Sequence, residues 1–190
     1  LGQLTPIEIR AELFRRGDYD FIVTGKDEKG NDVIHEKQRE ALKILRDDLT
    51  NVLVYGGGAG SGKTVLGCNW LLFMCILYPG TRWYVARNEL KTIVGTVFQT
   101  FKDLCKKYGF SDYKFNAVKN IITFGNDSTI DLLEIKTQPS DPYHEDLGSY
   151  EFTGGWIEEA GEIDYEGAKA IRGRTGRWKN VELGIKQKLL

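Results

Sequence analysis

The glycine-rich segment at residues 56–64 constrains the fold more than any other part of the chain. Five of its first seven residues are glycine, and a lysine and a threonine follow. The spacing Gly57-x-x-x-x-Gly62-Lys63-Thr64 matches the P-loop, a phosphate-binding loop between a strand and a helix. An apolar run at 52–55 predicts a buried parallel strand before the loop, and an apolar stretch to about Leu77 predicts the helix after it.

Phosphate binding explains the entropic cost of so many glycines. Glycine takes the dihedral angles that turn backbone amides inward, and it lets a phosphate approach closely. Lys63 would neutralise β- and γ-phosphate oxygens, the Thr64 hydroxyl would ligate Mg²⁺, and the positive end of the next helix would add to the attraction. The predicted nucleotide-binding residues of the segment are Gly57, Gly58, Ala59, Gly60, Ser61, Gly62, Lys63, Thr64 and Val65.

Two other interpretations of this segment are weaker. A flexible glycine-rich turn would match the pattern only by chance, and the flanking strand and helix make chance a poorer explanation. A dinucleotide-binding turn requires G-x-G-x-x-G, and no frame of the segment gives that spacing. We therefore predict nucleotide binding, with ATP and Mg²⁺ as cofactors.

Strands and helices alternate along the rest of the chain. Apolar runs predict strands at 83–86, 121–124, 130–133 and 152–157 and the start of another at 185–190; periodicity and capping predict helices at 6–16, 36–49, 88–108 and 160–172; a polar loop is expected at 24–32. This alternation predicts an α/β fold with a mostly parallel central sheet and helices on both faces. We assign a P-loop NTPase of the additional-strand, RecA-like (ASCE) type, with an N-terminal helix and arm at 1–35 and an ATPase domain at 36–190.

Composition narrows the class of function. A net charge of −1 argues against a purely electrostatic nucleic-acid binder, so any contact with a polyanion must be local. The three cysteines form neither a paired framework nor a CxxC motif, which favours reduced thiols in the core. The most apolar window, residues 65–78, is too short for a membrane span, and no signal peptide is visible, so we expect no membrane contact.

A second motif supplies acids to the predicted nucleotide site. The stretch Phe152–Glu159, FTGGWIEE, is an apolar strand that ends in two carboxylates, which is the Walker B arrangement. We expect Glu158 to hold Mg²⁺ and Glu159 to orient and activate the attacking water. Glutamate stands where aspartate is more common, which leaves the two roles open to exchange. The alternative is that both are merely favourable acids in the first turn of a helix.

Two further side chains fit a nucleotide site less specifically. Gln38 precedes the P-loop strand, where its amide could read the edge of adenine with a paired donor and acceptor; an exposed helical glutamine is the alternative. Arg87 follows the strand at 83–86 and could reach a phosphate, while a surface salt bridge is the competing interpretation.

Three arginines follow the acidic segment closely, in IRGRTGR. Arg172, Arg174 and Arg177 could reach the γ-phosphate of a neighbouring subunit, since arginine delivered in this way switches on hydrolysis, or they could contact DNA phosphates. The third interpretation is a solvated basic helix end that complements the helix dipole. The candidate catalytic residues are Lys63, Arg87, Glu159, Arg172, Arg174 and Arg177.

Taken in order, these segments resemble the N-terminal ATPase domain of the large terminase subunit of tailed bacteriophages. The resemblance rests on HEKQREAL, GGGAGSGKT, YVARN, GGWIEEAGEI and IRGRTGR, which span about residues 36–190. The P-loop is generic, whereas GGWIEEA with the later arginines is more specific to the family. The resemblance implies an ATP-driven motor that threads viral double-stranded DNA into a procapsid, in the cytoplasm of the infected bacterial host.

The resemblance also implies partners. They are the portal protein, the small terminase subunit and further copies of the chain in a homo-oligomeric ring, with each active site near a neighbour's arginine. Family members continue into a coupling motif and a metal-dependent nuclease domain; the sequence shows neither, so we expect a piece of a longer protein. Some terminases place the trans-acting arginine just before the Walker B strand, but residues 140–150 contain none. We therefore expect it among Arg172, Arg174 and Arg177.

Other classes of protein stay open. A helicase or recombinase-like ATPase would share the sheet and the Walker pair. A non-catalytic nucleotide-binding module would result if Glu159 pointed away from the nucleotide. A GTPase is disfavoured because the sequence has no Asn-Lys-x-Asp guanine reader, and a small-molecule kinase would normally have an arginine-rich lid.

Overall fold

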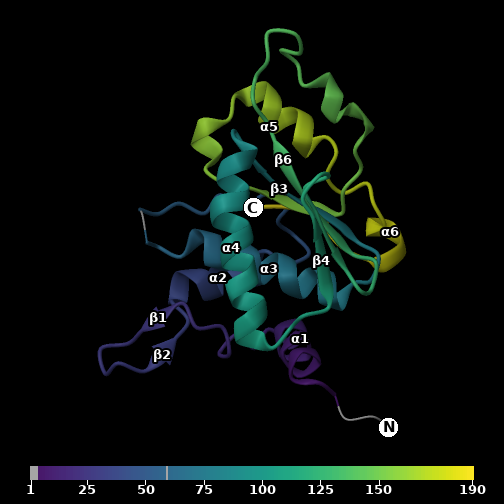
Figure 1. The fold of residues 1–190 in the computed structure, drawn as a ribbon. Coiled ribbons are helices and arrows are strands. Elements are labelled where there is room, and N and C mark those ends of the chain that lie inside the picture. Colours follow the sequence, from purple (N-terminus) through teal and green to yellow (C-terminus); the bar gives the residue numbers. More distant parts are fainter. Residues whose placement is uncertain (1–3, 59) are drawn as a thin grey trace.

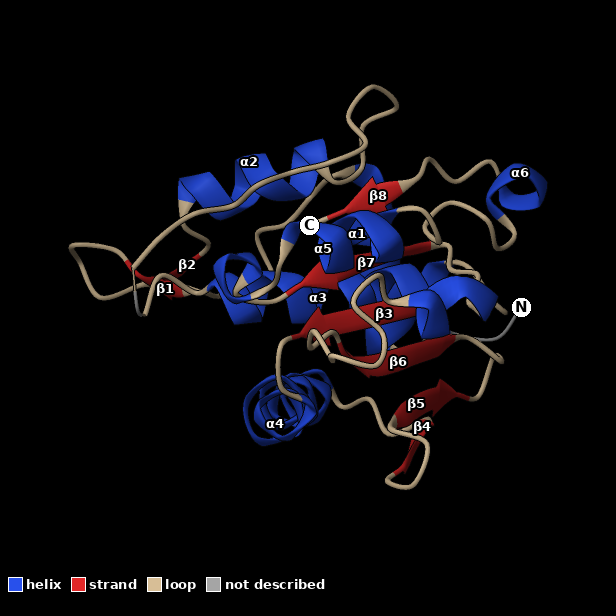
Figure 2. Cartoon of the chain, turned by 90° about the horizontal axis from the view of Figure 1, so that it is seen from above, coloured by secondary structure: helices blue, strands red, loops and turns tan. Residues whose placement is uncertain are grey.

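A six-stranded mixed sheet forms the centre of the computed structural model, which describes residues 4–58 and 60–190. Figure 2 shows the strands in the order β4 (Tyr113–Asn116), β5 (Ile121–Phe124), β6 (Thr129–Glu134), β3 (Arg82–Arg87), β7 (Gly154–Ile157) and β8 (Lys188–Leu189). The last four strands are parallel, and β4 and β5 add an antiparallel edge. The predicted α/β fold with a mostly parallel sheet is confirmed.

Helices cover both faces of this sheet (Figure 1). The first face carries α3 (Lys63–Leu77) and α4 (Leu90–Tyr108), and α1 (Pro6–Arg16) and α2 (Glu36–Ile44) pack against α3. The second face carries α5 (Tyr165–Arg172) and the 3-10 turn η1 (Glu145–Ser149). The shorter elements are β1 (Gly25–Lys26), β2 (Asp32–Val33), η2 (Ala160–Glu162) and α6 (Asn180–Leu183).

The side chains of β3 alternate between two apolar cores. Trp83 and Val85 belong to the core under α3 and α4, whereas Tyr84 and Ala86 pack in the core on the α5 side. Successive residues of a strand point to opposite faces of the sheet, so an apolar run without alternation is required when both faces are covered. This explains why the strand could be recognised as buried from its sequence.

Two glycines in β7 make room for the aromatic rings of β3. Gly154 is paired with Trp83 and Gly155 with Tyr84, and a Cβ on either glycine would collide with its partner's ring. Gly67 in α3 serves the next residue of β7, because a Cβ there would lie 2.6 Å from the ring of Trp156. The glycines of GGW therefore have a packing function, and they let α3 approach β7 closely.

The N-terminal segment packs on the core of the first face. Thr5 and Glu8 form the predicted capping box at the start of α1, and the ring of Phe14 stacks on that of Phe73 with centroids 5.0 Å apart. The polar segment 24–32 was expected as a loop, but β1 and β2 pair as a hairpin that projects from the body of the protein in Figure 1. Two-residue strands are too short to leave a periodic pattern in a sequence, which is why the prediction failed.

The segment that leads into the glycine loop differs from its prediction. We expected a buried parallel strand at 52–55, but the structure forms only a single parallel bridge from Val52 to Leu189 and a hydrogen bond from the Leu53 N–H to the Leu189 oxygen, 2.9 Å. Val54 is 88% exposed. The segment lies beside β8 at the outer edge of the sheet, so its second side has no strand to cover it. The apolar run correctly indicated extended backbone and wrongly indicated burial.

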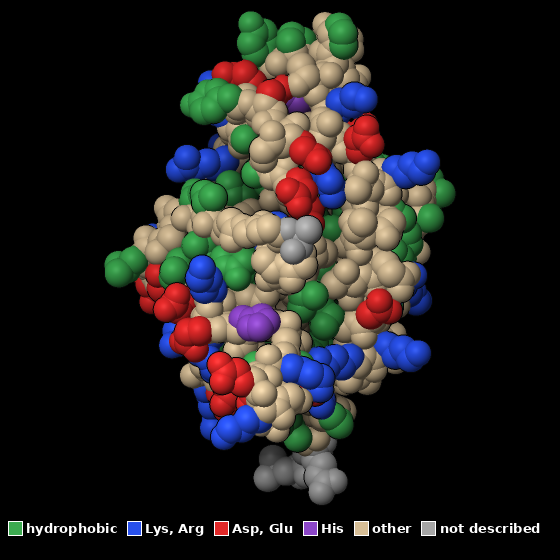
Figure 3. Space-filling view, turned by 90° about the vertical axis from the view of Figure 1, so that its left-hand side faces the viewer, with side chains coloured by type: hydrophobic (Ala, Val, Ile, Leu, Met, Phe, Trp, Pro, Cys, Tyr) green, Lys and Arg blue, Asp and Glu red, His purple; other side chains and the backbone are tan. Residues whose placement is uncertain are grey.

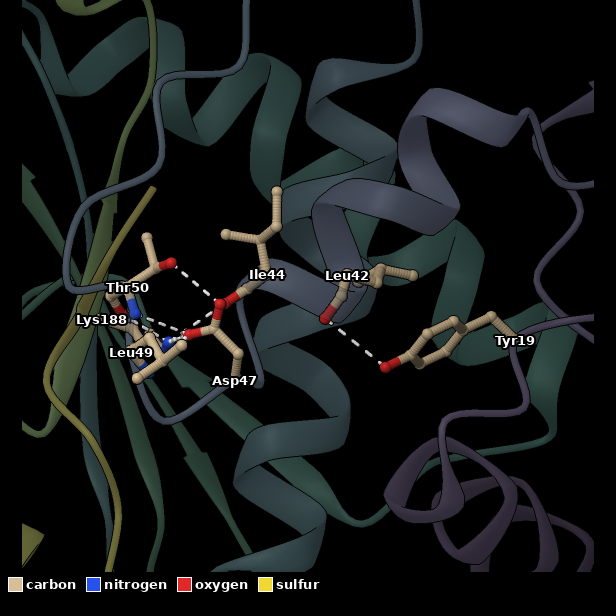
Figure 4. A network of polar contacts seen from close by, with 7 residues as sticks. All are labelled: Tyr19, Leu42, Ile44, Asp47, Leu49, Thr50 and Lys188. Carbon is tan, nitrogen blue, oxygen red and sulfur yellow. Dashed lines mark hydrogen bonds and ion pairs between the residues drawn. The ribbon is translucent and has the colours of Figure 1, made fainter.

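A buried lysine fixes the turn before this segment (Figure 4). Lys188 in β8 is 3% exposed, and its ammonium donates to the carbonyl oxygens of Ile44 and Thr50 at 3.0 and 2.5 Å and to the Asp47 carboxylate at 2.9 Å. Three acceptors match the three donors of an ammonium group. The lysine thereby joins β8 to the end of α2.

Two helix boundaries also differ from the prediction. Helix α2 ends at Ile44 rather than Leu49, because the Asp47 carboxylate accepts the N–H groups of Leu49 and Thr50 and stabilises a turn instead. Helix α5 begins at Tyr165 rather than near residue 160, since Asp164 caps it by accepting the Gly167 N–H. Of the helices in residues 4–58 and 60–190, none has the length and apolar character to cross a membrane.

Candidate functional site

The glycine loop delivers the start of α3 without a side-chain cap. Gly60 and Gly62 have φ of +78° and +75°, which non-glycine residues seldom adopt. Gly62 is the N-cap of α3, and no side chain accepts a hydrogen bond from the first turn of that helix. The first-turn N–H groups of a helix carry partial positive charge and bind anions. Ala59, one of the predicted cradle residues, lies outside the described residues.

Thr64 connects the loop to the acidic end of β7. Its hydroxyl donates to Oε1 of Glu158 at 2.9 Å, across 94 positions of sequence. Strand β7 points its carboxyl end at the first turn of α3, as the Walker A and Walker B assignments require. The structure thus brings together the two motifs that the sequence analysis treated separately.

Glu158 and Glu159 have different environments. Glu158 is 5% exposed, and burial raises the pKa of its carboxyl above 4.5, with the negative charge of Glu159 in the same direction and the Thr64 hydrogen bond against it. Glu159 is exposed and has φ of +50°, in the left-handed region that is uncommon for a non-glycine residue. Such strained residues concentrate at functional sites.

The lysine of the loop is folded back onto the loop. Lys63 Nζ donates to the carbonyl oxygens of Gly57 and Gly58 at 2.7 and 3.4 Å. The ammonium therefore already lies on the loop that would receive a phosphate. Val65, the last predicted cradle residue, continues the first turn of α3, and its carbonyl oxygen accepts from the side chain of Asn69 at 2.8 Å.

A cavity of about 390 Å³ lies beside the loop. Its walls are residues 52–57 on one side and the end of β7 with residues 158–161 on the other, and Lys63, Leu189 and Leu190 complete it. The cavity is therefore apolar where the lead-in segment diverges from β8 and acidic where β7 ends. No group of three or more His, Cys, Asp and Glu side chains gathers among the described residues as a ready-made metal cage.

Gln38 contacts the loop directly. It is completely buried, which excludes the alternative of an exposed helical glutamine, and its amide Nε2 donates to the carbonyl oxygens of Ser61 and Gly62 at 3.0 and 3.1 Å. The expected role in reading adenine stays a prediction.

Arg87 lies at the carboxyl end of β3 and forms a paired contact with Glu162. Its Nε and Nη2 donate to the two carboxylate oxygens, both at 3.1 Å. This contact and the nearby charges of Glu158 and Glu159 raise the pKa of the Arg87 guanidinium above its ordinary value. The salt-bridge interpretation describes the geometry, and a phosphate contact would require Arg87 to leave Glu162.

The three later arginines are far from Glu158 within the chain. The Phe152 N–H donates to the Arg174 oxygen and the Arg177 N–H to the Phe152 oxygen, both at 2.9 Å. Phe152 precedes Glu158 by six residues, which in an extended strand is about 20 Å. Arg174 and Arg177 line a separate cavity of about 530 Å³ with Tyr143, Glu145 and Lys169, and Arg172 is exposed at the end of α5. These arginines do not reach the chain's own glycine loop, and the trans role stays a prediction.

Some residues of this region were not identified from the sequence. Lys188 and Asp47 were missed, although a lysine inside the apolar run KLL was a usable signal. Glu162 was not named as the partner of Arg87, and no sequence pattern points to that pair. On the face shown in Figure 3, acidic and basic side chains are interspersed.

Comparison with known proteins gives matches in structure only. No family model matches the chain, and no curated protein matches its sequence. Large terminase from a thermophilic bacteriophage, in complex with ADP, has a TM-score of 0.61 at 16% identity, over 74% of this chain and 36% of that chain. A second crystal form of the same terminase has a TM-score of 0.62 at 16% identity, over 82% of this chain and 44% of that chain.

The large terminase ATPase domain of Thermus phage P74-26 is also similar. It has a TM-score of 0.52 at 14% identity, over 76% of this chain and 62% of that chain. The chain therefore shares the fold of large terminases, which confirms the predicted resemblance at the level of the fold. It spans less than half the length of the thermophilic phage terminase that it matches.

Proposed function

We propose that this chain is a Mg²⁺-dependent P-loop ATPase that drives viral double-stranded DNA into a procapsid. The observation that carries the proposal is the hydrogen bond from Thr64 to Glu158 at 2.9 Å. It joins the end of a phosphate-binding loop to a buried carboxylate at the end of the neighbouring strand, and hydrolysis of a nucleoside triphosphate needs both parts in one place.

The order of the strands supports the additional-strand type. Strand β8 lies between β7, which ends in Glu158, and Val52, which leads into the glycine loop. An extra strand between the P-loop strand and the Walker B strand defines this type.

Lys63 and the loop amides would bind the phosphates. Phosphate oxygens carry full charge and are stronger acceptors than the carbonyl oxygens of Gly57 and Gly58. Lys63 would therefore exchange these two carbonyls for β- and γ-phosphate oxygens.

The donor atoms around Thr64 fit Mg²⁺. This ion prefers oxygen ligands and typically takes one or two protein oxygens with phosphate oxygens and water. Thr64 and Glu158 would supply the protein oxygens, and the bound ion would neutralise charge on the transferred phosphate. Glu159 would then orient the attacking water from its exposed position beside the cavity.

The terminase fold supports the motor role. The compared terminases were solved with ADP and with ATP-γ-S, and the same fold in this chain favours ATP as its nucleotide. Double-stranded DNA, the portal protein, the small terminase subunit and a homo-oligomeric ring are proposed as partners on this basis, in the cytoplasm of the infected host. Arg172, Arg174 and Arg177 would serve a neighbour's nucleotide, since they lie far from their own.

ATP binding and hydrolysis, measured side by side, test the proposal. We expect Lys63→Ala to lose ATP binding and Glu159→Gln to bind ATP but hydrolyse it about 10²- to 10⁴-fold more slowly. The control is Glu151→Gln, an exposed acid before β7, which should behave as the wild type. Absence of Mg²⁺-dependent hydrolysis in the wild type, or equal rates in all variants, would refute the proposal. Strand separation without packaging activity would favour the helicase alternative.

A further inference from the structure

The buried amide of Gln38 holds two consecutive peptide units of the glycine loop. Its two N–H donors meet the carbonyl oxygens of Ser61 and Gly62 at 3.0 and 3.1 Å. A flipped amide would place its own oxygen against those two oxygens, so the chemistry fixes its orientation. The Gln38 oxygen itself is buried without a partner among the described residues.

The geometry of a peptide unit turns this contact into control of the loop. In a planar trans peptide the C=O and the N–H point in opposite directions. Drawing the carbonyls of Ser61 and Gly62 toward α2 therefore directs the N–H groups of Gly62 and Lys63 away from α2. These two N–H groups stand at the start of α3, where an anion is expected to bind.

The fit between Gln38 and the loop is close. Gly62 has φ of +75°, and a Cβ on it would collide with the Gln38 amide nitrogen. The glycine is therefore required twice, once for its backbone conformation and once for the approach of the amide.

We propose that Gln38 is a positioning residue for the phosphate-binding loop, and that it supports binding of any triphosphate, whether or not a base is attached. This inference rests on the proposed function, because it assumes that the loop binds phosphate. It differs from the expected role in reading adenine, since a completely buried amide that already holds two carbonyls has no donor left for a base.

Inorganic tripolyphosphate distinguishes the two roles because it has no base. We would titrate tripolyphosphate, ATP and GTP, each with Mg²⁺, into the wild type, Gln38→Ala and Gln38→Met by calorimetry. Met keeps the volume of the side chain, so it remains informative if Gln38→Ala is unstable. The control is Lys37→Ala, one position earlier on α2 and exposed.

We expect both Gln38 variants to weaken all three ligands by a similar factor, about tenfold for two lost hydrogen bonds, with Lys37→Ala unchanged. A loss for ATP with none for tripolyphosphate would overturn the inference in favour of adenine reading. Unchanged binding of all three ligands would overturn it as well. A wild type that binds none of them would overturn the proposed function and this inference together.

Discussion

The Thr64 hydroxyl donates a 2.9 Å hydrogen bond to the Glu158 carboxylate, although the two residues are 94 positions apart. The contact joins the first turn of α3 to the carboxyl end of β7. A buried carboxylate is costly unless it has partners, and the single hydroxyl offsets only part of the cost. The relationship is economical for a site that awaits a cation, and it predicts how stability depends on Glu158.

Replacing the Glu158 carboxylate should stabilise the protein at neutral pH. Burial raises the pKa of Glu158 above 4.5, so the folded state loses stability as the pH rises through 4.5 and then through the folded value. We expect Glu158→Gln to melt at a higher temperature than the wild type at pH 7 without nucleotide, with the difference shrinking toward pH 4. Melting curves by circular dichroism at the two pH values measure this, and identical curves at pH 7 would be inconsistent with it.

Lys188 should be one of the most sensitive surface-distant positions. Lys188→Met leaves the carbonyls of Ile44 and Thr50 without their ammonium donor, which should cost about 2–4 kcal/mol of the free energy of unfolding. Lys186→Met is the matched control, because Lys186 is exposed in the same segment, and should change it by less than about 0.5 kcal/mol. Urea unfolding of both variants decides, and equal midpoints would contradict the network of Figure 4.

The same network predicts a dependence on acid. Hydrogen bonds from Thr50 and Lys188 hold the pKa of Asp47 well below its usual 3.8. Its contribution is therefore complete above 3.8 and is lost as the pH falls below that value. The stability gap between the wild type and Asp47→Asn should be full at pH 6 and narrow below pH 3.8; a gap that widens in acid would argue against it.

The glycines of β7 should not tolerate a methyl group. A Cβ on Gly155 would collide with the Tyr84 ring, so Gly155→Ala should cost about 1–3 kcal/mol through overpacking. A Cβ on Gly161 meets nothing within 4 Å, which makes Gly161→Ala the control. Thermal melting compares them, and equal stability would show that the β3–β7 contact is looser than described.

The arginines can be tested by mixing variants. If Arg174 acts on a neighbour's nucleotide, Arg174→Ala and Glu159→Gln protomers should each hydrolyse ATP poorly, while their mixture regains activity through sites that combine intact parts. Titrating one variant into the other at fixed total protein measures the gain. A mixture that shows only the sum of its components, at every protein concentration, would rule out action in trans.

The sequence predicted the parts of the fold that depend on local patterns. Strand β3 and helix α3 were identified because their apolar runs and the glycine loop mark them, and α1 because Thr5 and Glu8 form its cap. Burial of residues 52–55 was wrong, since the position of a strand at the edge of a sheet is decided by distant segments. The ends of α2 and α5 were missed because Asp47 and Asp164 redirect the backbone through side-chain contacts.

The candidate site was predicted in its motifs but not in its contacts. Thr64 and Glu158 were both assigned to the metal, and the structure places them together. The pairing of Arg87 with Glu162 and the burial of Gln38 depend on how α2 and η2 pack, which no single stretch of sequence encodes. The expected reach of Arg174 could not be judged before the length of β7 separated it from Glu158.

Titration of ATP by calorimetry, with and without Mg²⁺, tests the central claim most directly when the wild type and Thr64→Val are compared. If Thr64 and Glu158 hold the ion beside the glycine loop, Mg²⁺ should tighten ATP binding to the wild type by about tenfold or more, and Thr64→Val should lose most of that gain. A wild type that binds no ATP, or a variant that keeps the full effect of Mg²⁺, would contradict the account.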